Sequence, residues 1–189
     1  MKKATQSLIL LLILSFGACN NNQPEQEPQP QKQKNFMELA CSLSGLDQNA
    51  ASTLLTTEGY SLNEEKESYK QYVKDIYKIT IGFDNSIVYF VDGRGYPVSN
   101  ISNLLIDWLN TADENGYSQL MVNHVNYSNS SNKDYESTTA LKNAIQGAKD
   151  SELDYVEVVL RNTTTYAGLG IMFERYNDAF EAWIQLQGY

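Results

Sequence analysis

The chain has 189 residues, a formal net charge of −9 at pH 7, two cysteines and one histidine. An acidic protein does not present the basic surface that nucleic-acid phosphates require, so the composition argues against DNA or RNA binding. The two cysteines, Cys19 and Cys41, are too few for a disulfide-rich fold. With a single histidine we expect no zinc site and no resident cofactor.

A short positively charged and apolar segment opens the chain. Lys2 and Lys3 precede an apolar run over residues 8–16, which is the pattern of a secretory signal peptide. The run is shorter than the roughly 20 apolar residues that a membrane-spanning helix needs. It ends in the residues FGAC at 16–19, which resemble the lipobox of bacterial lipoproteins, where an aliphatic and two small residues precede a cysteine.

The lipobox resemblance implies that residues 1–18 are removed and that Cys19 becomes a lipidated first residue. Several acyl chains, at about 0.8 kcal/mol for each buried CH₂ group, make such an anchor stable without an amphipathic helix. The alternative is an ordinary secreted protein in which Cys19 is incidental. Loss of Lys2 and Lys3 moves the formal net charge from −9 to −11.

Residues 19–35 predict a tether. The segment NNNQPEQEPQPQKQK contains no aliphatic or aromatic residue and three of the four prolines, so we expect it to be disordered and extended. Asn20 follows Cys19, whereas inner-membrane lipoproteins of enteric bacteria carry Asp there. The resemblance therefore implies the outer membrane, and whether the protein faces the periplasm or the medium stays open.

Residues 36–189 have the length of one domain. Apolar spacing predicts a helix over residues 36–44 and a second helix capped by Asp47 and ended by Gly59. A meander over residues 59–95 follows, with hairpin turns at residues 84–85 and 92–95. Residues 63–76 fit a helix as well as strands, and we favour two strands with a turn at residues 74–75.

The second half continues with alternating helices and strands. We expect a helix capped by Ser99 or Asn100 and ended at residues 115–116, then a strand over 117–127 and a helix over 135–146. A hairpin joins residues 153–161 to residues 165–175. Phe180, Trp183 and Ile184 then predict a terminal helix capped by Asn177. The fold class is α+β: an antiparallel sheet, made of the meander and the C-terminal hairpin, with helices packed on one face.

A short sequence pattern occurs twice. Residues 55–61 and 109–118 each lead from a helix through Gly-Tyr-Ser into a strand, and either an internal repeat or chance explains the match. The helix pair that leads through Gly59 and Tyr60 into a meander also resembles the small inhibitor-like α+β domains of the β-lactamase-inhibitor-protein type. That resemblance covers residues 37–91 and implies a protein-binding domain.

The residues that commonly carry catalysis are sparse. His124 is the only histidine, is expected inside a strand, and has no Gly-x-Ser-x-Gly motif to supply a nucleophile. Cys41 lies in an apolar helical stretch and is expected to be a buried small hydrophobe. The oxygen-rich turns at residues 84–85 and 113–116 do not have calcium-loop spacing, so we expect no metal site.

One strand carries a candidate ligand face. Opposite Leu169 and Ile171, alternation places Tyr166, Gly168, Gly170 and Met172 on one side, and Tyr155 of the partner strand reaches the same side. Two glycines on one strand face leave a strip that a ligand or another backbone can approach closely. The alternative is that a helix covers the strip and the glycines accommodate its packing.

These observations favour a lipid-anchored outer-membrane protein that is not an enzyme and that binds an envelope protein or peptide. A surface glycan-binding module that uses exposed tyrosines is the second hypothesis. An unrecognised hydrolase that depends on His124 or on paired carboxylates is the third.

Overall fold

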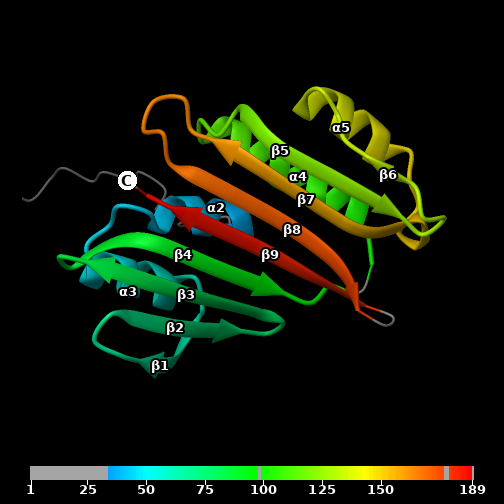
Figure 1. The fold of residues 1–189 in the computed structure, drawn as a ribbon. Coiled ribbons are helices and arrows are strands. Elements are labelled where there is room, and N and C mark those ends of the chain that lie inside the picture. Colours follow the sequence, from blue (N-terminus) through cyan, green and yellow to red (C-terminus); the bar gives the residue numbers. More distant parts are fainter. Residues whose placement is uncertain (1–33, 98, 177–178, 189) are drawn as a thin grey trace, which may run out of the picture. The chain divides into compact units, whose positions relative to one another are not determined.

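The computed structural model describes residues 34–97, 99–176 and 179–188 (Figure 1). In chain order the helices are α2 (Phe36–Leu43), α3 (Gln48–Thr57), α4 (Ile101–Glu114) and α5 (Thr138–Gln146), with a 3₁₀ turn at Asp150–Glu152. The strands are β1 (Ser61–Glu65), β2 (Tyr69–Lys74), β3 (Tyr77–Asp84), β4 (Ile87–Gly95), β5 (Gln119–Tyr127), β6 (Asn132–Lys133), β7 (Leu153–Arg161), β8 (Gly168–Tyr176) and β9 (Ala179–Gln187).

The strands form one antiparallel sheet in the order β1-β2-β3-β4-β9-β8-β7-β5-β6. The fold is therefore α+β, as the sequence predicts. Residues 63–76 contribute to β1 and β2, which confirms the strand interpretation of that segment. The predicted C-terminal hairpin is β7 and β8, and a third strand, β9, extends it and pairs with β4 in the middle of the sheet (Figure 1).

The chain uses one helix-and-meander arrangement twice. Helix α3 leads into the meander β1-β2-β3-β4, and helix α4 leads into β5-β7-β8-β9, with β6 and α5 inserted between β5 and β7. The two meanders meet through their last strands, β4 and β9, which pair antiparallel. The repeated Gly-Tyr-Ser pattern lies at the same place in both halves, where the helix turns into the first strand.

The two helix ends share one hydrogen-bond pattern. Gly59 and Gly116 adopt left-handed backbone conformations, with φ of 87° and 85°. The following tyrosines, Tyr60 and Tyr117, are buried, and each backbone N–H donates to a carbonyl five residues earlier at 2.9 Å. Glycine is favoured at these positions because a left-handed residue closes the last helical turn without a Cβ clash. The shared geometry identifies the Gly-Tyr-Ser pattern as one structural motif present in both halves.

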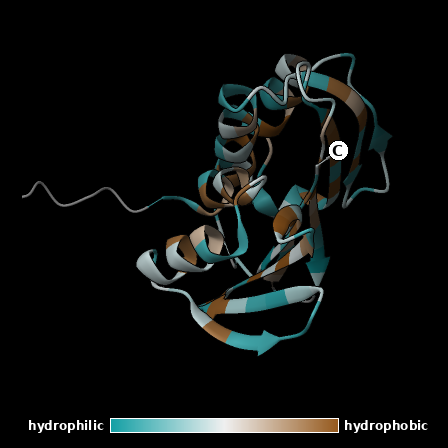
Figure 2. Cartoon of the chain, turned by 90° about the vertical axis from the view of Figure 1, so that its left-hand side faces the viewer, coloured by the Kyte–Doolittle hydropathy of each residue, from teal (hydrophilic) through white to brown (hydrophobic). Residues whose placement is uncertain are grey.

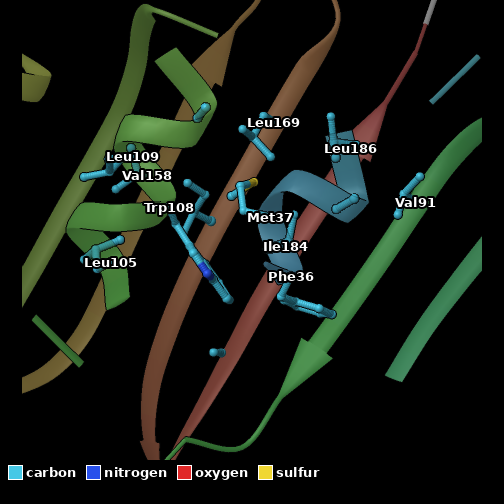
Figure 3. Close-up of a cluster of buried hydrophobic side chains, with 14 of the residues drawn as sticks. Phe36, Met37, Val91, Leu105, Trp108, Leu109, Val158, Leu169, Ile184 and Leu186 are labelled. Carbon is cyan, nitrogen blue, oxygen red and sulfur yellow. The ribbon is translucent and has the colours of Figure 1, made fainter. Parts of the chain in front are cut away.

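The helices lie on one side of the sheet, as Figure 2 shows. Trp108 of α4 is buried between Phe36 of α2 and Phe173 of β8, with ring centroids 5.6 and 5.0 Å away. Around it, side chains from α2, α4, β8 and β9 interlock in the core of the domain (Figure 3). In the described part of the chain, the sheet therefore has one face packed under helices and one face without them.

The helix starts are capped in two ways. The Asp47 side chain accepts hydrogen bonds from two backbone N–H groups at the start of α3, as predicted. For α4, however, Asn100 forms no side-chain cap, and Asp150 accepts from the backbone of Ile101 at 3.0 Å and of Ser102 at 3.3 Å. The prediction that Ser99 or Asn100 caps α4 is wrong because a carboxylate distant in sequence satisfies these donors.

Two further predictions are wrong. The predicted terminal helix is the strand β9, and its predicted cap Asn177 lies outside the described residues. The predicted turn at residues 92–95 is the end of β4. Gly93 and Gly95 are present there because rings occupy the space a side chain would need: a Cβ would lie 2.7 Å from Phe36 Cζ at Gly93 and 2.6 Å from the Tyr77 ring at Gly95.

The predicted signal peptide and the lipidated Cys19 lie outside the described residues, as does the tether up to residue 33. Within the described residues, no helix has both the length and the apolar character needed to cross a membrane.

Candidate functional site

The candidate site is the face of the sheet without helices, which we call the open face. Side chains alternate between the two faces of a strand, so the residues between buried core positions point away from the helices. On the four middle strands the open face carries Asp92 and Arg94 (β4); Glu181, Trp183, Gln185 and Gln187 (β9); Gly168, Gly170, Met172 and Glu174 (β8); and Tyr155, Glu157, Val159 and Arg161 (β7).

Two glycines on this face are not required by the fold. A Cβ on Gly168 would meet no atom within 4 Å, and one on Gly170 would meet only Gln185 atoms, at 3.9 Å. Neither residue has a positive φ. Gly93 and Gly95 differ, because there a side chain has no room. Glycine inside a strand is less stable than alanine by about 0.5–1 kcal/mol, so Gly168 and Gly170 leave free space over β8 at a cost in stability.

We call the surface of β8 over Gly168 and Gly170 the glycine strip. Gly170 lies between Val159 of β7 and Gln185 of β9 in the register of the sheet, and Gly168 lies between Arg161 and Gln187. Next to Gly170 the strip deepens into a cavity of about 380 Å³. Its lining includes Glu157 and Val159 from β7, Gly170 and Met172 from β8, and Trp183 and Gln185 from β9.

One wall of the cavity is a stacked cation and indole. The Arg94 guanidinium carbon lies 4.1 Å from the centroid of the Trp183 ring. Arg94 also pairs with Asp92 at 3.4 Å and with Glu181 at 3.6 Å, and all three side chains are partly buried. The two carboxylates hold the guanidinium over the ring. The Trp183 Nε1 atom is buried without an acceptor among the described residues.

The end of the strip near Met172 is acidic. Glu157 and Glu174 form no ion pair with any described residue, while Asp92 and Glu181 share Arg94. Burial, followed by the charge of Glu157, a hydrogen bond to Glu157 and the charge of Glu174, raises the pKa of the Tyr155 phenol above its ordinary value. The Tyr155 hydroxyl therefore interacts with the Glu157 carboxylate at this acidic end of the strip.

The structure places the predicted ligand residues only partly together. Gly168 and Gly170 share the open face, as predicted, and none of the described helices packs over them. Tyr155 is on the same face but opposite Glu174, at the far end of β7. Tyr166 precedes β8 in the connecting turn, with a left-handed backbone (φ 61°) and its ring 4.8 Å from the Arg161 guanidinium. Its predicted position on the strand is therefore wrong.

The most prominent contributors, Trp183, Arg94 and Gln185, are not predicted from the sequence. The sequence predicts a helix around Trp183 and a turn at residues 92–95. In neither case would these side chains be expected on a sheet face, whereas both segments are strands. A period-two pattern is nevertheless present: Phe180, Ala182, Ile184 and Leu186 are buried, with polar or amphipathic residues between them. That strict alternation favours a strand over a helix.

Two residues considered for chemistry are engaged elsewhere. His124 lies on β5 with its Nδ1 atom 2.9 Å from Asp134, and its ring meets Tyr155 edge-on. Cys41 packs against the core, and burial raises the pKa of its thiol to about 12. In the part of the chain that the structure describes, no three His, Cys, Asp or Glu side chains are grouped so as to hold a metal ion.

Comparisons of the chain with protein-family models, with curated proteins and with solved structures found no match. Function is therefore inferred from the site itself.

Proposed function

We propose that the protein is a lipid-anchored envelope protein whose domain binds a protein or peptide on the open face of its sheet, without catalysis. The observation that carries the proposal is the glycine strip. Gly168 and Gly170 leave space that neither backbone conformation nor core packing requires. The space is bordered by an indole, a thioether and amide groups, which suit contact with another chain.

The binding proposal is tested by filling the strip. Gly170→Tyr adds a ring over β8 at a position with room for a Cβ, so we expect the fold to be retained. Asp107→Tyr adds the same ring at an exposed position of α4, on the helix side, and is the matched control. Both variants and the wild type are expressed in the source cells, crosslinked with formaldehyde and purified by an affinity tag.

We expect one or more proteins to crosslink to the wild type and to Asp107→Tyr but not to Gly170→Tyr. If the same proteins crosslink equally to all three forms, the open face is not the binding surface. If the Gly170→Tyr protein is folded by circular dichroism, loss of the partner reports blocked contact and not unfolding.

The anchor is a separate part of the proposal. It is supported by the lipobox-like residues 16–19 and is tested with Cys19→Ala. We expect the wild type to incorporate labelled palmitate and to fractionate with the outer membrane, and the variant to do neither. Protease treatment of intact cells then separates the two orientations, because a surface-facing domain is released and a periplasmic domain is protected.

A glycan-binding function is the second candidate, favoured by another hollow. A cavity of about 570 Å³ is lined by Asn115, Asn162 and Asp84, with the half-exposed ring of Tyr89 beside it. Amide and carboxylate groups next to a tyrosine ring match the hydroxyls and apolar faces of a sugar. Binding on a glycan array that Tyr89→Ala abolishes and Gly170→Tyr leaves intact would favour this candidate over peptide binding.

A further inference from the structure

The dimensions of the glycine strip match one extended polypeptide. The open-face residues of β7 and β9 are separated by two strand spacings, which is roughly 10 Å, and over two successive open-face positions only Gly168 and Gly170 lie between them, with Met172 at the next position. Successive open-face positions on β8 are about 6.7 Å apart. The strip is therefore wide enough for a single strand-like backbone running along β8 and too narrow for a helix, whose diameter is about 10–12 Å with side chains.

Amide groups border the strip on one side. Gln185 and Gln187 point from β9 onto the open face, and both are exposed. Neither side chain forms a hydrogen bond with another described residue, whereas most of the polar groups around Arg94 are paired with each other. A glutamine amide carries both a donor and an acceptor, so it can bond the N–H and C=O groups of a backbone. The two glutamines therefore suit the main chain of an extended ligand.

The acidic end of the strip selects the charge of that ligand. Glu157, Met172 and Trp183 occupy one row across β7, β8 and β9. Glu157 has no basic partner among the described residues. Glu174, at the next open-face position of β8 after Met172, has none among them either. A Lys or Arg side chain beside Glu157 would contact the thioether of Met172, while the indole beyond it is already stacked by Arg94. An acidic side chain there would meet repulsion from Glu157, Glu174 and Asp92.

We propose that the ligand is an extended protein segment that lies along β8 over Gly168 and Gly170 and places a Lys or Arg side chain beside Glu157. The inference depends on the proposed binding function and adds the conformation and charge of the ligand. It combines three independent features of the open face: glycines that the fold does not require, glutamine amides without partners among the described residues, and a carboxylate without a basic partner among them.

The test uses the full-length protein in detergent and a positional-scanning library of nine-residue peptides, each pool with one fixed central residue. Binding of the labelled wild type is compared with that of Gly170→Tyr, Glu157→Gln and Asp107→Asn. The last variant removes the same charge as Glu157→Gln from the opposite side of the domain, so it controls for the net charge of the protein.

We expect the Lys and Arg pools to bind at least tenfold more strongly than the Glu and Gln pools. Glu157→Gln should remove that preference, Asp107→Asn should keep it, and Gly170→Tyr should lower binding to all pools at least tenfold. Binding that Gly170→Tyr abolishes but that shows no preference for a basic centre would overturn this inference and leave the proposed function standing. Absence of peptide binding, or binding that Gly170→Tyr does not affect, would contradict both.

Discussion

Alanine substitution at two glycines of the sheet distinguishes space that the fold needs from space left for a ligand. Gly93 lies in β4 and Gly168 in β8, and the two glycines differ in the space available for a side chain. A Cβ at Gly93 would be 2.7 Å from Phe36 Cζ and 3.2 Å from Phe36 Cε1, where carbon atoms normally approach to about 3.5–4.0 Å. A Cβ at Gly168 would meet no heavy atom within 4 Å.

The Phe36 ring cannot move easily, because it is buried with Tyr77 and Trp108 at centroid distances of 4.5 and 5.6 Å. Overpacking of this kind costs about 1–3 kcal/mol, so Gly93→Ala should lower the free energy of unfolding by that amount. Gly168→Ala reduces the entropy of the unfolded chain without strain and should raise the free energy of unfolding by about 0.4–1 kcal/mol. The two variants should therefore differ by roughly 1.5–4 kcal/mol.

Urea unfolding, monitored by far-ultraviolet circular dichroism, measures both free energies of unfolding. An unchanged dependence of the free energy on urea concentration confirms that only stability differs. If Gly168→Ala is destabilising by more than about 1 kcal/mol, the fold itself requires that glycine and the strip is not space left for a ligand. If Gly93→Ala is neutral, the packing assigned to Phe36 is wrong.

Four further predictions concern the domain as a whole. Asp150→Ala should lower the free energy of unfolding by about 1 kcal/mol, because the start of α4 loses its acceptor; an unchanged urea midpoint would contradict the distant cap. Gly59→Ala should cost about 1–2 kcal/mol because the residue holds a left-handed turn, and Gly116→Ala should cost at least as much, because its Cβ would also lie 2.9 Å from Asn162 Nδ2; tolerance at either position would contradict the shared motif. The Cys41 thiol, with its pKa raised to about 12, should react with a disulfide reagent at pH 8 far more slowly in the native protein than in urea. Because of this raised pKa, Cys41 ionises at lower pH in the unfolded than in the folded protein, so the free energy of unfolding should fall as the pH rises above about 9. The fall should be smaller in Cys41→Ala; an equal fall in the wild type and in Cys41→Ala would contradict the raised pKa.

The sequence predicts the fold class because most elements carry strong local signals. Asp47 caps α3 as expected, and the alternation of residues 169–173 places Gly168 and Gly170 on one face. The helix predicted at β9 is wrong because it relied on the helical spacing of Phe180, Trp183 and Ile184 and overlooked the strand-like alternation of the buried residues Phe180, Ala182, Ile184 and Leu186. In the folded domain this strand pairs with β8 and with β4, and β4 is distant in the sequence.

The same reason limits prediction of the site. Asp92 and Gly93 form a common turn pair, yet Gly93 is present because Phe36 of a distant helix occupies its side-chain space. Whether a helix covers Gly168 and Gly170 depends on the order of strands in the sheet. Trp183 lies next to the glycine strip only because β9 pairs with β8. Local patterns do not contain that order.

Photocrosslinking from the strip tests the central claim most directly, since it captures a bound protein of any sequence. Benzoylphenylalanine is placed at Gly168, where the structure leaves open space, and at Asp107 on α4 as the control, in full-length protein in the source cells. If the open face holds a protein partner, irradiation should give a discrete crosslinked adduct from position 168 and none from position 107. Adducts from position 107 alone, or none from position 168, would contradict the claim.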